Sequence, residues 1–332
     1  MDESRIFNAS VINQAAPSRI PVRSISLLIV VAVILYVGMV SLADWEKFGV
    51  AVSLLPAELW VQVVLLSLLS YLLRFVRWNY FIAAFGYKVP ILRNLGIYLA
   101  AFALTLTPGK MGEMIRTAYL HPYGVTYAHS ICAFFSERLL DLLAVGVLAS
   151  FMVSMLPEQQ SWIFVVIVSV VAVFLFFLSL RSPLDALIGR RNATDTVFGH
   201  FSKMSDAMGF LLSGRRFAIA APLSLVAWMV QGISLYLVVH ALGYDLAVCT
   251  IIAIYCLSIL AGAVSFIPGG IGATEAAIVL LLSMVGIGQA DAITASLVSR
   301  GITLWLAVGI GAVAMIKTVV VHGNSTFVKP SG

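Results

Sequence analysis

The sequence Pro108-Gly109-Lys110-Met111-Gly112-Glu113 interrupts an apolar run that begins near residue 91, and Pro268-Gly269-Gly270-Ile271-Gly272 interrupts another that begins near residue 247. Proline removes a backbone donor and glycine widens the allowed φ range, so each cluster is expected to end a helix. Inside a bilayer, broken backbone is tolerated only where protein buries it or a water-filled cavity meets it. We therefore expect two re-entrant hairpins or discontinuous helices, which would bend at Pro108, Gly109, Gly112, Pro268, Gly269, Gly270 and Gly272.

The composition around these breaks is that of a protein embedded in lipid. Of the 332 residues, 61% are hydrophobic and only 11% are charged, whereas soluble domains average about a quarter charged residues. Too few polar side chains remain to cover a water-facing surface. Only residues 181–216 resemble a long polar loop, so no extramembrane catalytic domain fits in the chain.

Six uninterrupted segments are long enough to span a membrane, which takes roughly 20 apolar residues. They cover about 22–42, 57–83, 125–153, 161–180, 217–241 and 289–317. Lys and Arg occur in the N-terminal tail, after the second segment, in 181–216 and at the C-terminus, but not in 154–160 or 242–246. Because cytoplasmic loops are enriched in Lys and Arg, both termini are expected in the cytoplasm. The first hairpin would then enter the membrane from the cytoplasm and the second from outside.

These boundaries divide the chain into a cytoplasmic tail (1–21), a first membrane repeat (22–153), a second membrane repeat (154–317) and a C-terminal cytoplasmic tail (318–332). Within the 181–216 loop, apolar residues at helical spacing predict an amphipathic helix. They are Val197, Phe201, Met204, Met208 and Leu211. This helix would lie on the cytoplasmic membrane surface or pack on the underside of the bundle.

The two halves of the chain resemble each other around the breaks. In each half a Pro-Gly pair precedes a glutamate that lies 25 residues before an arginine: Pro108-Gly109, Glu113 and Arg138 in the first, and Pro268-Gly269, Glu275 and Arg300 in the second. Phe85-Gly86-Tyr87 and Leu242-Gly243-Tyr244 precede the two interrupted runs. Three spans per half is an odd number, so the second half would be inverted relative to the first, as in many transporters.

Arg138 and Arg300 lie near the middle of their predicted spans. An arginine at that depth costs about 3 kcal/mol on insertion scales, so each must face the bundle interior and meet a carboxylate or an anionic ligand. Glu113 and Glu275, at the two breaks, are the candidate partners. Beside Arg138, Asp141 lies one helical turn away on the same face, whereas the adjacent Glu137 points elsewhere.

These charges predict a polar cavity between the repeats, where Arg138 and Arg300 would bind an anionic head group. Guanidinium binds phosphate bidentately and stays charged, and helix N-termini after the breaks would add N–H donors. Lys110 and Arg116 would add charge at the cytoplasmic mouth, and Arg77 could line the entrance. The alternative is that each Glu–Arg pair only fastens a hairpin to its neighbouring span.

Other residues and motifs point to no chemistry of their own. Arg74 and Trp78 end the second span, where interfacial anchoring is expected. The chain has no phosphate-binding GxxxxGK[ST], no HExxH and no GxSxG motif, so we expect no metal, no cofactor and no nucleic-acid partner. Two alternatives to transport stay open: a lipid-modifying enzyme using Glu113, Glu137 and Asp141, or a non-catalytic partner of an envelope-lipid synthesis complex that docks through 181–216.

Residues 106–116 and 136–141, with 266–275 and Arg300, resemble the membrane domain of lysylphosphatidylglycerol synthases, the flippase-like domain proteins. The resemblance runs from about 22 to 317 and implies an all-α integral membrane protein. In the best-known members a soluble aminoacyltransferase domain follows the membrane domain, whereas this sequence ends near residue 332. The resemblance therefore implies a freestanding member that translocates lipid and is not an enzyme. The implied setting is a bacterial inner membrane. The implied cargo is an anionic or head-group-modified envelope lipid, either a phospholipid or a polyprenyl-phosphate-linked lipid, and envelope-lipid synthesis enzymes are candidate partners.

Overall fold

The computed structural model describes residues 49, 52–53, 55–150 and 197–325. The predicted spans 22–42 and 161–180, the 154–160 loop and the N-terminal tail lie outside these ranges. Within them every regular element is a helix, and no strand is present.

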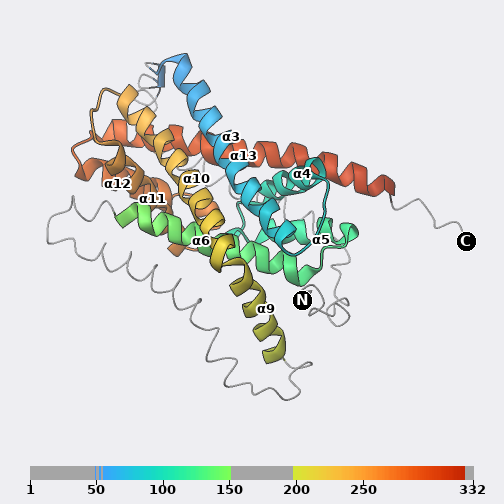
Figure 1. The fold of residues 1–332 in the computed structure, drawn as a ribbon. Helices are drawn as coiled ribbons and strands as arrows, with labels where there is room; N and C mark the ends of the chain where they lie inside the picture. The colour runs from blue at the N-terminus through green and yellow to red at the C-terminus, as the bar shows by residue number, and fades with distance from the viewer. Residues whose placement is uncertain (1–48, 50–51, 54, 151–196, 326–332) are drawn as a thin grey trace, which may run out of the picture.

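Four long helices match four of the predicted spans (Figure 1). They are α3 (Ala57–Ala84), α6 (Tyr127–Ser150), α10 (Gly214–Ala241) and α13 (Gln289–Ser325). In the described part of the chain, α3, α10 and residues 289–317 of α13 are long and apolar enough to cross a membrane. Helix α6 has 24 residues but carries Glu137, Arg138 and Asp141 at its centre. The chain is thus an all-α membrane protein, as its composition predicts.

Both apolar runs are broken where the Pro-Gly clusters predict. The first forms α4 (Ile91–Ala101) and the 3₁₀ helices η3 (Phe102–Leu104) and η4 (Pro108–Ile115), followed by α5 (Arg116–Leu120) and η5 (His121–Tyr123). The second forms α11 (Val248–Val264), the 3₁₀ turn η9 (Pro268–Gly270) and α12 (Ala273–Met284). Gly269, Gly270 and Gly272 have φ angles of 65°, 66° and 87°, which side chains with a Cβ rarely adopt.

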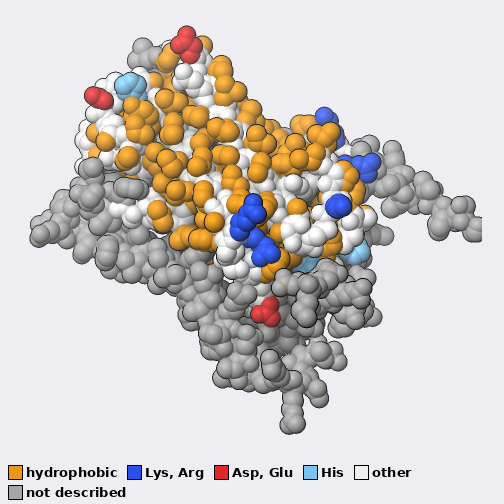
Figure 2. Space-filling view, viewed as in Figure 1, with side chains coloured by type: hydrophobic (Ala, Val, Ile, Leu, Met, Phe, Trp, Pro, Cys, Tyr) orange, Lys and Arg blue, Asp and Glu red, His pale blue; other side chains and the backbone are white. Residues whose placement is uncertain are grey.

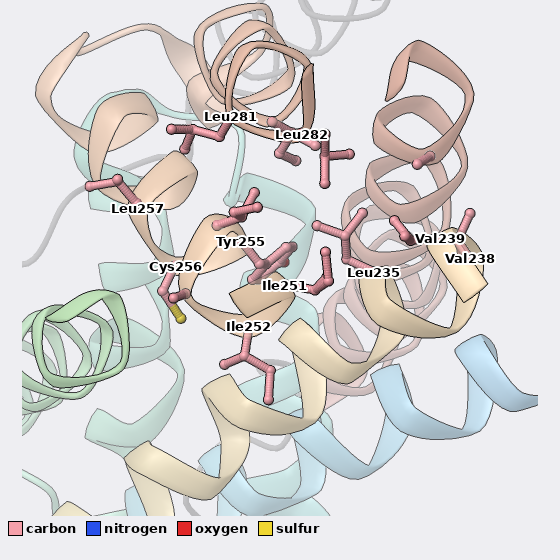
Figure 3. Close-up of a cluster of buried hydrophobic side chains, with 14 of the residues drawn as sticks. Leu235, Val238, Val239, Ile251, Ile252, Tyr255, Cys256, Leu257, Leu281 and Leu282 are labelled. Atoms are coloured by element: carbon pink, nitrogen blue, oxygen red, sulfur yellow. The ribbon is translucent and has the colours of Figure 1, made fainter. Parts of the chain in front are cut away.

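Helix α11 lies at the centre of the larger apolar core. It packs against α10, α12 and α6, and Figure 3 shows its side chains meeting those of the neighbouring helices. Labelled members of this cluster include Leu235, Val238, Ile251, Ile252, Tyr255, Cys256, Leu281 and Leu282. A helix that is apolar on all sides is stable only when protein or lipid surrounds it.

The two halves pack reciprocally. The first half's α4 lies against the second half's α13, and the second half's α11 lies against the first half's α6. Helices α3 and α10, which have 28 residues each, pack on each other, and the breaks meet where η4 contacts η9. Each of these contacts therefore has a counterpart when the two halves are exchanged, as an internal repeat requires.

Matching loops support the same correspondence. Helices α3 and α10 end before Gly86 and Gly243, which have φ angles of 88° and 91°, and a tyrosine follows each glycine. The Tyr87 hydroxyl lies 2.8 Å from His129 Nδ1 near the start of α6. The Tyr244 hydroxyl donates to Asp291 Oδ2 at 2.6 Å near the start of α13. Inversion of the halves across the membrane stays a prediction, since two spans lie outside the described residues.

The predicted amphipathic helix is α9 (Val197–Leu211). Its second half lies against α6, where Ala207 and Leu211 are buried and the Cys132 thiol lies 3.6 Å from the Met204 carbonyl oxygen. This half of α9 therefore packs on the bundle, which is one of the two positions predicted for the helix.

Candidate functional site

A cavity of about 240 Å³ lies where the two breaks meet. Both broken segments line it, together with α3, α6, α10, α11 and α13. Its charged lining consists of the cations Arg74, Lys110, Arg138 and Arg300 and the carboxylates Glu113 and Asp141. Aromatic and aliphatic side chains such as Tyr98, Trp228 and Ile259 form the remaining wall.

The second-half couple predicted from the sequence is present and also holds the break. Arg300 Nε donates to Glu275 Oε1 at 3.1 Å, and Arg300 Nη2 donates to the Gly269 carbonyl oxygen at 2.9 Å. The other Glu275 oxygen accepts the Gly272 N–H at 2.7 Å. Glu275 therefore accepts the hydrogen bond of the α12 N-cap amide itself. The sequence had suggested that such helix N-termini would donate to a ligand.

The first-half couple is longer. Arg138 Nη2 lies 3.7 Å from Glu113 Oε2 and 3.4 Å from Asp141 Oδ2. The Thr105 hydroxyl donates to Glu113 Oε1 at 2.9 Å. The Arg138 side chain keeps 22% of its surface exposed, against 7% for Arg300. Arg138 is thus the more loosely held of the two mid-membrane arginines.

A fully buried layer of charges supports Arg138 and Asp141 from behind. Arg77 Nη1 donates to Asp141 Oδ1 at 2.7 Å and to the Ser224 hydroxyl oxygen, and Arg77 Nη2 reaches Glu137 Oε1 at 3.4 Å. Glu137 turns away from the cavity, as its position beside Arg138 predicts. Arg77 does not line the cavity, so the prediction that it lines the entrance is wrong.

Arg116 is also part of this buried layer. Its Nη2 donates to Glu137 Oε2 at 2.7 Å, and its guanidinium carbon lies 3.8 Å from the centre of the Trp78 ring. Arg116 and Trp78 are both fully buried. The sequence placed Arg116 at the cytoplasmic mouth and Trp78 at the lipid interface, and both predictions are wrong because the surrounding helices enclose these side chains.

Arg74 is the site residue that the sequence analysis missed. It was expected to anchor the interface, but it lines the cavity and is only 8% exposed. Its guanidinium stacks over Trp228 at 4.2 Å, and its Nε and Nη2 atoms have no hydrogen-bond partner. One signal was available: Arg74 lies three residues before Arg77, so both project from one side of α3.

Lys110 lies in the first break and lines the cavity, whereas its predicted place at the cytoplasmic mouth stays a prediction. Its φ angle is 56°, a left-handed conformation that costs a side-chain-bearing residue roughly 1–2 kcal/mol. The break thus holds this amine in place despite the strain of its backbone.

Positive charge exceeds negative charge in the cavity and its supporting layer. In the part of the chain that the structure describes, six cationic side chains face four carboxylates there, an excess of two: Arg74, Arg77, Lys110, Arg116, Arg138 and Arg300 against Glu113, Glu137, Asp141 and Glu275. Arg77, Arg116, Arg138 and Arg300 each pair with a carboxylate, so the excess falls to Arg74 and Lys110. A low-dielectric pocket with surplus positive charge favours an anion.

Metal binding finds no support in the same region. Among the described residues no group of three or more His, Cys, Asp or Glu side chains is placed to hold a metal ion. The acids that an enzyme would need, Glu113, Glu137 and Asp141, each lie within 4.0 Å of an arginine nitrogen.

Comparison with known proteins identifies related membrane proteins. A family model described as the lysylphosphatidylglycerol synthase TM region matches residues 24–311. The chain is 23% identical over 292 residues to a UPF0104 membrane protein of Pyrococcus horikoshii, an alignment that covers 77% of this chain and 87% of the relative. It is 23% identical over 313 residues to a UPF0104 membrane protein of Methanothermobacter thermautotrophicus, covering 86% of this chain and 90% of that one.

Proposed function

Because the chain belongs to the lysylphosphatidylglycerol synthase transmembrane-region family, we propose that it moves an anionic lipid between the leaflets, with the head group passing through the central cavity. The observation that carries this proposal is the cavity's unpaired positive charge. Among the described residues no carboxylate oxygen forms an ion pair with Arg74, and its buried Nε and Nη2 atoms have no hydrogen-bond partner. Leaving such a group buried is costly unless a ligand completes it.

The geometry suggests which contacts a head group would exchange. The 3.7 Å pair of Arg138 with Glu113 is the loosest of the charged contacts that face the cavity. A phosphate between Arg74, Lys110 and Arg138 would satisfy the free guanidinium donors and replace Glu113 on Arg138. Guanidinium and phosphate form parallel charge-assisted hydrogen bonds, so this exchange needs no chemical step and no cofactor.

The two broken hairpins provide the moving parts. Their breaks meet at the cavity, and broken helices near the membrane centre are the usual binding elements of transporters with inverted repeats. Glu275 and Arg300 would hold the second hairpin firmly, and the looser first hairpin would open. The two roles that the sequence left open are then divided between the couples. Glu275–Arg300 fastens the second hairpin to its neighbouring span, and Arg138 of the other couple binds the head group.

The charge count also narrows the cargo. A lysyl-modified phosphatidylglycerol head group carries two amines and one phosphate, so its net positive charge opposes a cavity with two excess cations. A phosphate monoester or diphosphate head group, as in polyprenyl-phosphate lipids, brings negative charge of matching size. We therefore propose an anionic phospholipid or a polyprenyl-phosphate-linked lipid, and not an aminoacylated one.

Orientation follows from the helix ends. Glu58 begins α3 and Asp291 begins α13, whereas Arg215 begins α10 and Lys317 lies toward the end of α13. Figure 2 shows an apolar face with acidic side chains at its upper end and basic ones lower down and to the right, and a further acidic group lies below the basic ones. We propose a cytoplasmic membrane with the basic end, and so both termini, inside. The bacterial assignment stays a prediction, because the relatives named above are archaeal.

The test is lipid exchange in proteoliposomes that contain the purified chain. Fluorescent phosphatidylglycerol, polyprenyl phosphate and lysyl-phosphatidylglycerol would each be placed in one leaflet, and a membrane-impermeant quencher would report transfer. We expect the first two to move, and Arg74→Gln and Arg138→Gln to slow transfer at least tenfold. Arg215→Gln, at an exposed position outside the cavity, is the matched control.

Two outcomes would decide against the proposal. Transfer at the wild-type rate by both cavity variants would show that the cavity does not carry the lipid. A modified lipid product, formed by the purified protein in detergent without a second leaflet, would instead favour the enzymatic alternative.

A further inference from the structure

An apolar groove of about 850 Å³ lies between α4 and α13, on the far side of these helices from the cavity. Tyr98, Phe102 and Ala307 line the cavity, whereas the groove is lined by other side chains of the same helices. Its apolar lining is Leu92, Leu95, Gly96, Ile97, Leu99, Trp305, Leu306, Gly309, Ile310, Val313 and Ala314. The groove is therefore separate from the proposed transport site.

Two glycines give the groove its depth. A Cβ atom added to Gly96 or Gly309 would have no atom within 4 Å, so space is open above both. The rim is exposed, because Leu92 keeps 79% and Val313 56% of its surface. An extended apolar trough open to the hydrocarbon has the shape that an acyl chain fills.

One end of the groove is basic. Arg93 and Lys317 line that end with Tyr123, and both cations are exposed. Arg93 Nη1 donates to the Tyr123 hydroxyl at 3.3 Å. Among the described residues no carboxylate lines the groove, and Figure 2 shows basic side chains gathered where α4 and the later part of α13 lie. A neutral lipid would leave these charges without a partner.

We propose that this groove binds one anionic phospholipid of the cytoplasmic leaflet. Its phosphate lies between Arg93 and Lys317, the Tyr123 hydroxyl supplies a further hydrogen bond, and an acyl chain runs over Gly96 and Gly309. Juxtamembrane cations attract anionic lipid by about 1 kcal/mol each. The bound lipid covers the contact of α4 with α13 and travels with the protein, whatever the cavity transports.

The test is native mass spectrometry of the full-length protein in mild detergent, titrated with phosphatidylglycerol and, separately, with phosphatidylcholine. We expect one tight phosphatidylglycerol adduct that survives in Arg74→Gln/Arg138→Gln, because the groove is independent of the cavity. Arg93→Gln/Lys317→Gln should weaken it about tenfold or more, from two lost cation contacts. Gly309→Leu should remove it by filling the trough.

Matched controls separate the groove from general surface effects. Arg215→Gln removes an exposed cation elsewhere, and Val61→Leu enlarges a lipid-facing side chain on α3 that is 60% exposed. Both should bind phosphatidylglycerol like the wild type. Equal affinity for phosphatidylcholine, or unchanged binding in both groove variants, would overturn the proposal. Loss of the adduct only in the cavity variant would assign the lipid to the cavity instead.

Discussion

At the scale of single residues, the arginines of the site fall into two physical classes. Arg77, Arg116 and Arg300 are buried and closely paired with carboxylates, so they neutralise charge inside the bundle. Arg74 stacks on Trp228 and has unpartnered donors, while Arg138 is held at longer distances. The first class maintains the structure and the second is available to a ligand.

This difference predicts opposite phenotypes for neighbouring arginines. Arg77→Gln leaves Asp141 and Glu137 without their cation, so stability should fall by about 3–5 kcal/mol. Arg74→Gln exposes no carboxylate and loses about 1–2 kcal/mol from its stacking on Trp228, yet it should abolish lipid transfer. Unfolding of the detergent-solubilised variants, followed by circular dichroism, measures the first effect. Equal destabilisation by the two substitutions would contradict the division.

The sequence predicted which charged side chains pair with each other better than it predicted whether lipid or protein surrounds them. Both Glu–Arg couples and the opposite directions of Glu137 and Asp141 could be predicted, because a charge at membrane depth needs a partner and helical spacing decides which face it occupies. The enclosure of Arg116 could not be predicted, and for Arg74 the sequence offered only its position three residues before Arg77. Whether the end of a span meets lipid or protein depends on helices that are distant in sequence, and here α10 and α6 enclose those positions.

Phe266 allows a second prediction at this scale. It has a φ angle of 54° and is 77% exposed beside the second break. Phe266→Gly should raise stability by about 1 kcal/mol, because glycine adopts this conformation without strain. Phe266→Ala loses the same ring but keeps the strain, so thermal unfolding of the two variants isolates the backbone effect. The backbone explanation fails if alanine stabilises as much as glycine.

At the scale of the elements, close helix approach holds the first hairpin in place. A Cβ on Gly311 would collide with the Ala103 backbone nitrogen and with Phe102, so α13 lies directly on η3. The breaks themselves could be predicted from Pro and Gly. This contact could not, because a glycine in a long apolar helix gives no sign of its neighbour.

Gly309 and Gly311, two residues apart in α13, make this contact testable. Gly311→Ala should destabilise the protein by about 1–3 kcal/mol through overpacking. Gly309→Ala has open space and should stabilise the helix by up to about 1 kcal/mol. The melting temperatures of both variants, compared with that of the wild type in the same detergent, show which substitution destabilises the protein and which stabilises it. Two stabilised variants would mean that α13 and η3 are not in close contact.

At the scale of the whole molecule, the reciprocal packing of the halves gives the bundle two similar ends. The repeat could be predicted from its short motifs, and the exchanged contacts of α4 with α13 and α11 with α6 agree with it. Acidic and basic helix ends distinguish the two sides and imply one orientation. The chain carries its own probe of that orientation, since Cys249 is exposed whereas Cys132 and Cys256 are buried.

Cys249 should therefore react with a membrane-impermeant maleimide in intact cells, because it lies beside the 242–246 loop that is expected outside. In the control, Cys249→Ser combined with Arg215→Cys moves the thiol from the start of α11 to the start of α10. That variant should be labelled only after the membrane is permeabilised. Mass spectrometry of labelled peptides identifies the site, and the reverse pattern would invert the topology.

The reciprocal packing also constrains how the protein is made. Helix α4 leaves the ribosome early, but its partner α13 begins only at residue 289. Until translation nears its end, the first broken segment lacks this partner, and incompletely packed broken backbone favours misassembly and recognition by quality-control proteases. Neither half can mature first, so biogenesis is completed in a single late step. Two separately encoded halves, produced together, should be able to perform that same step.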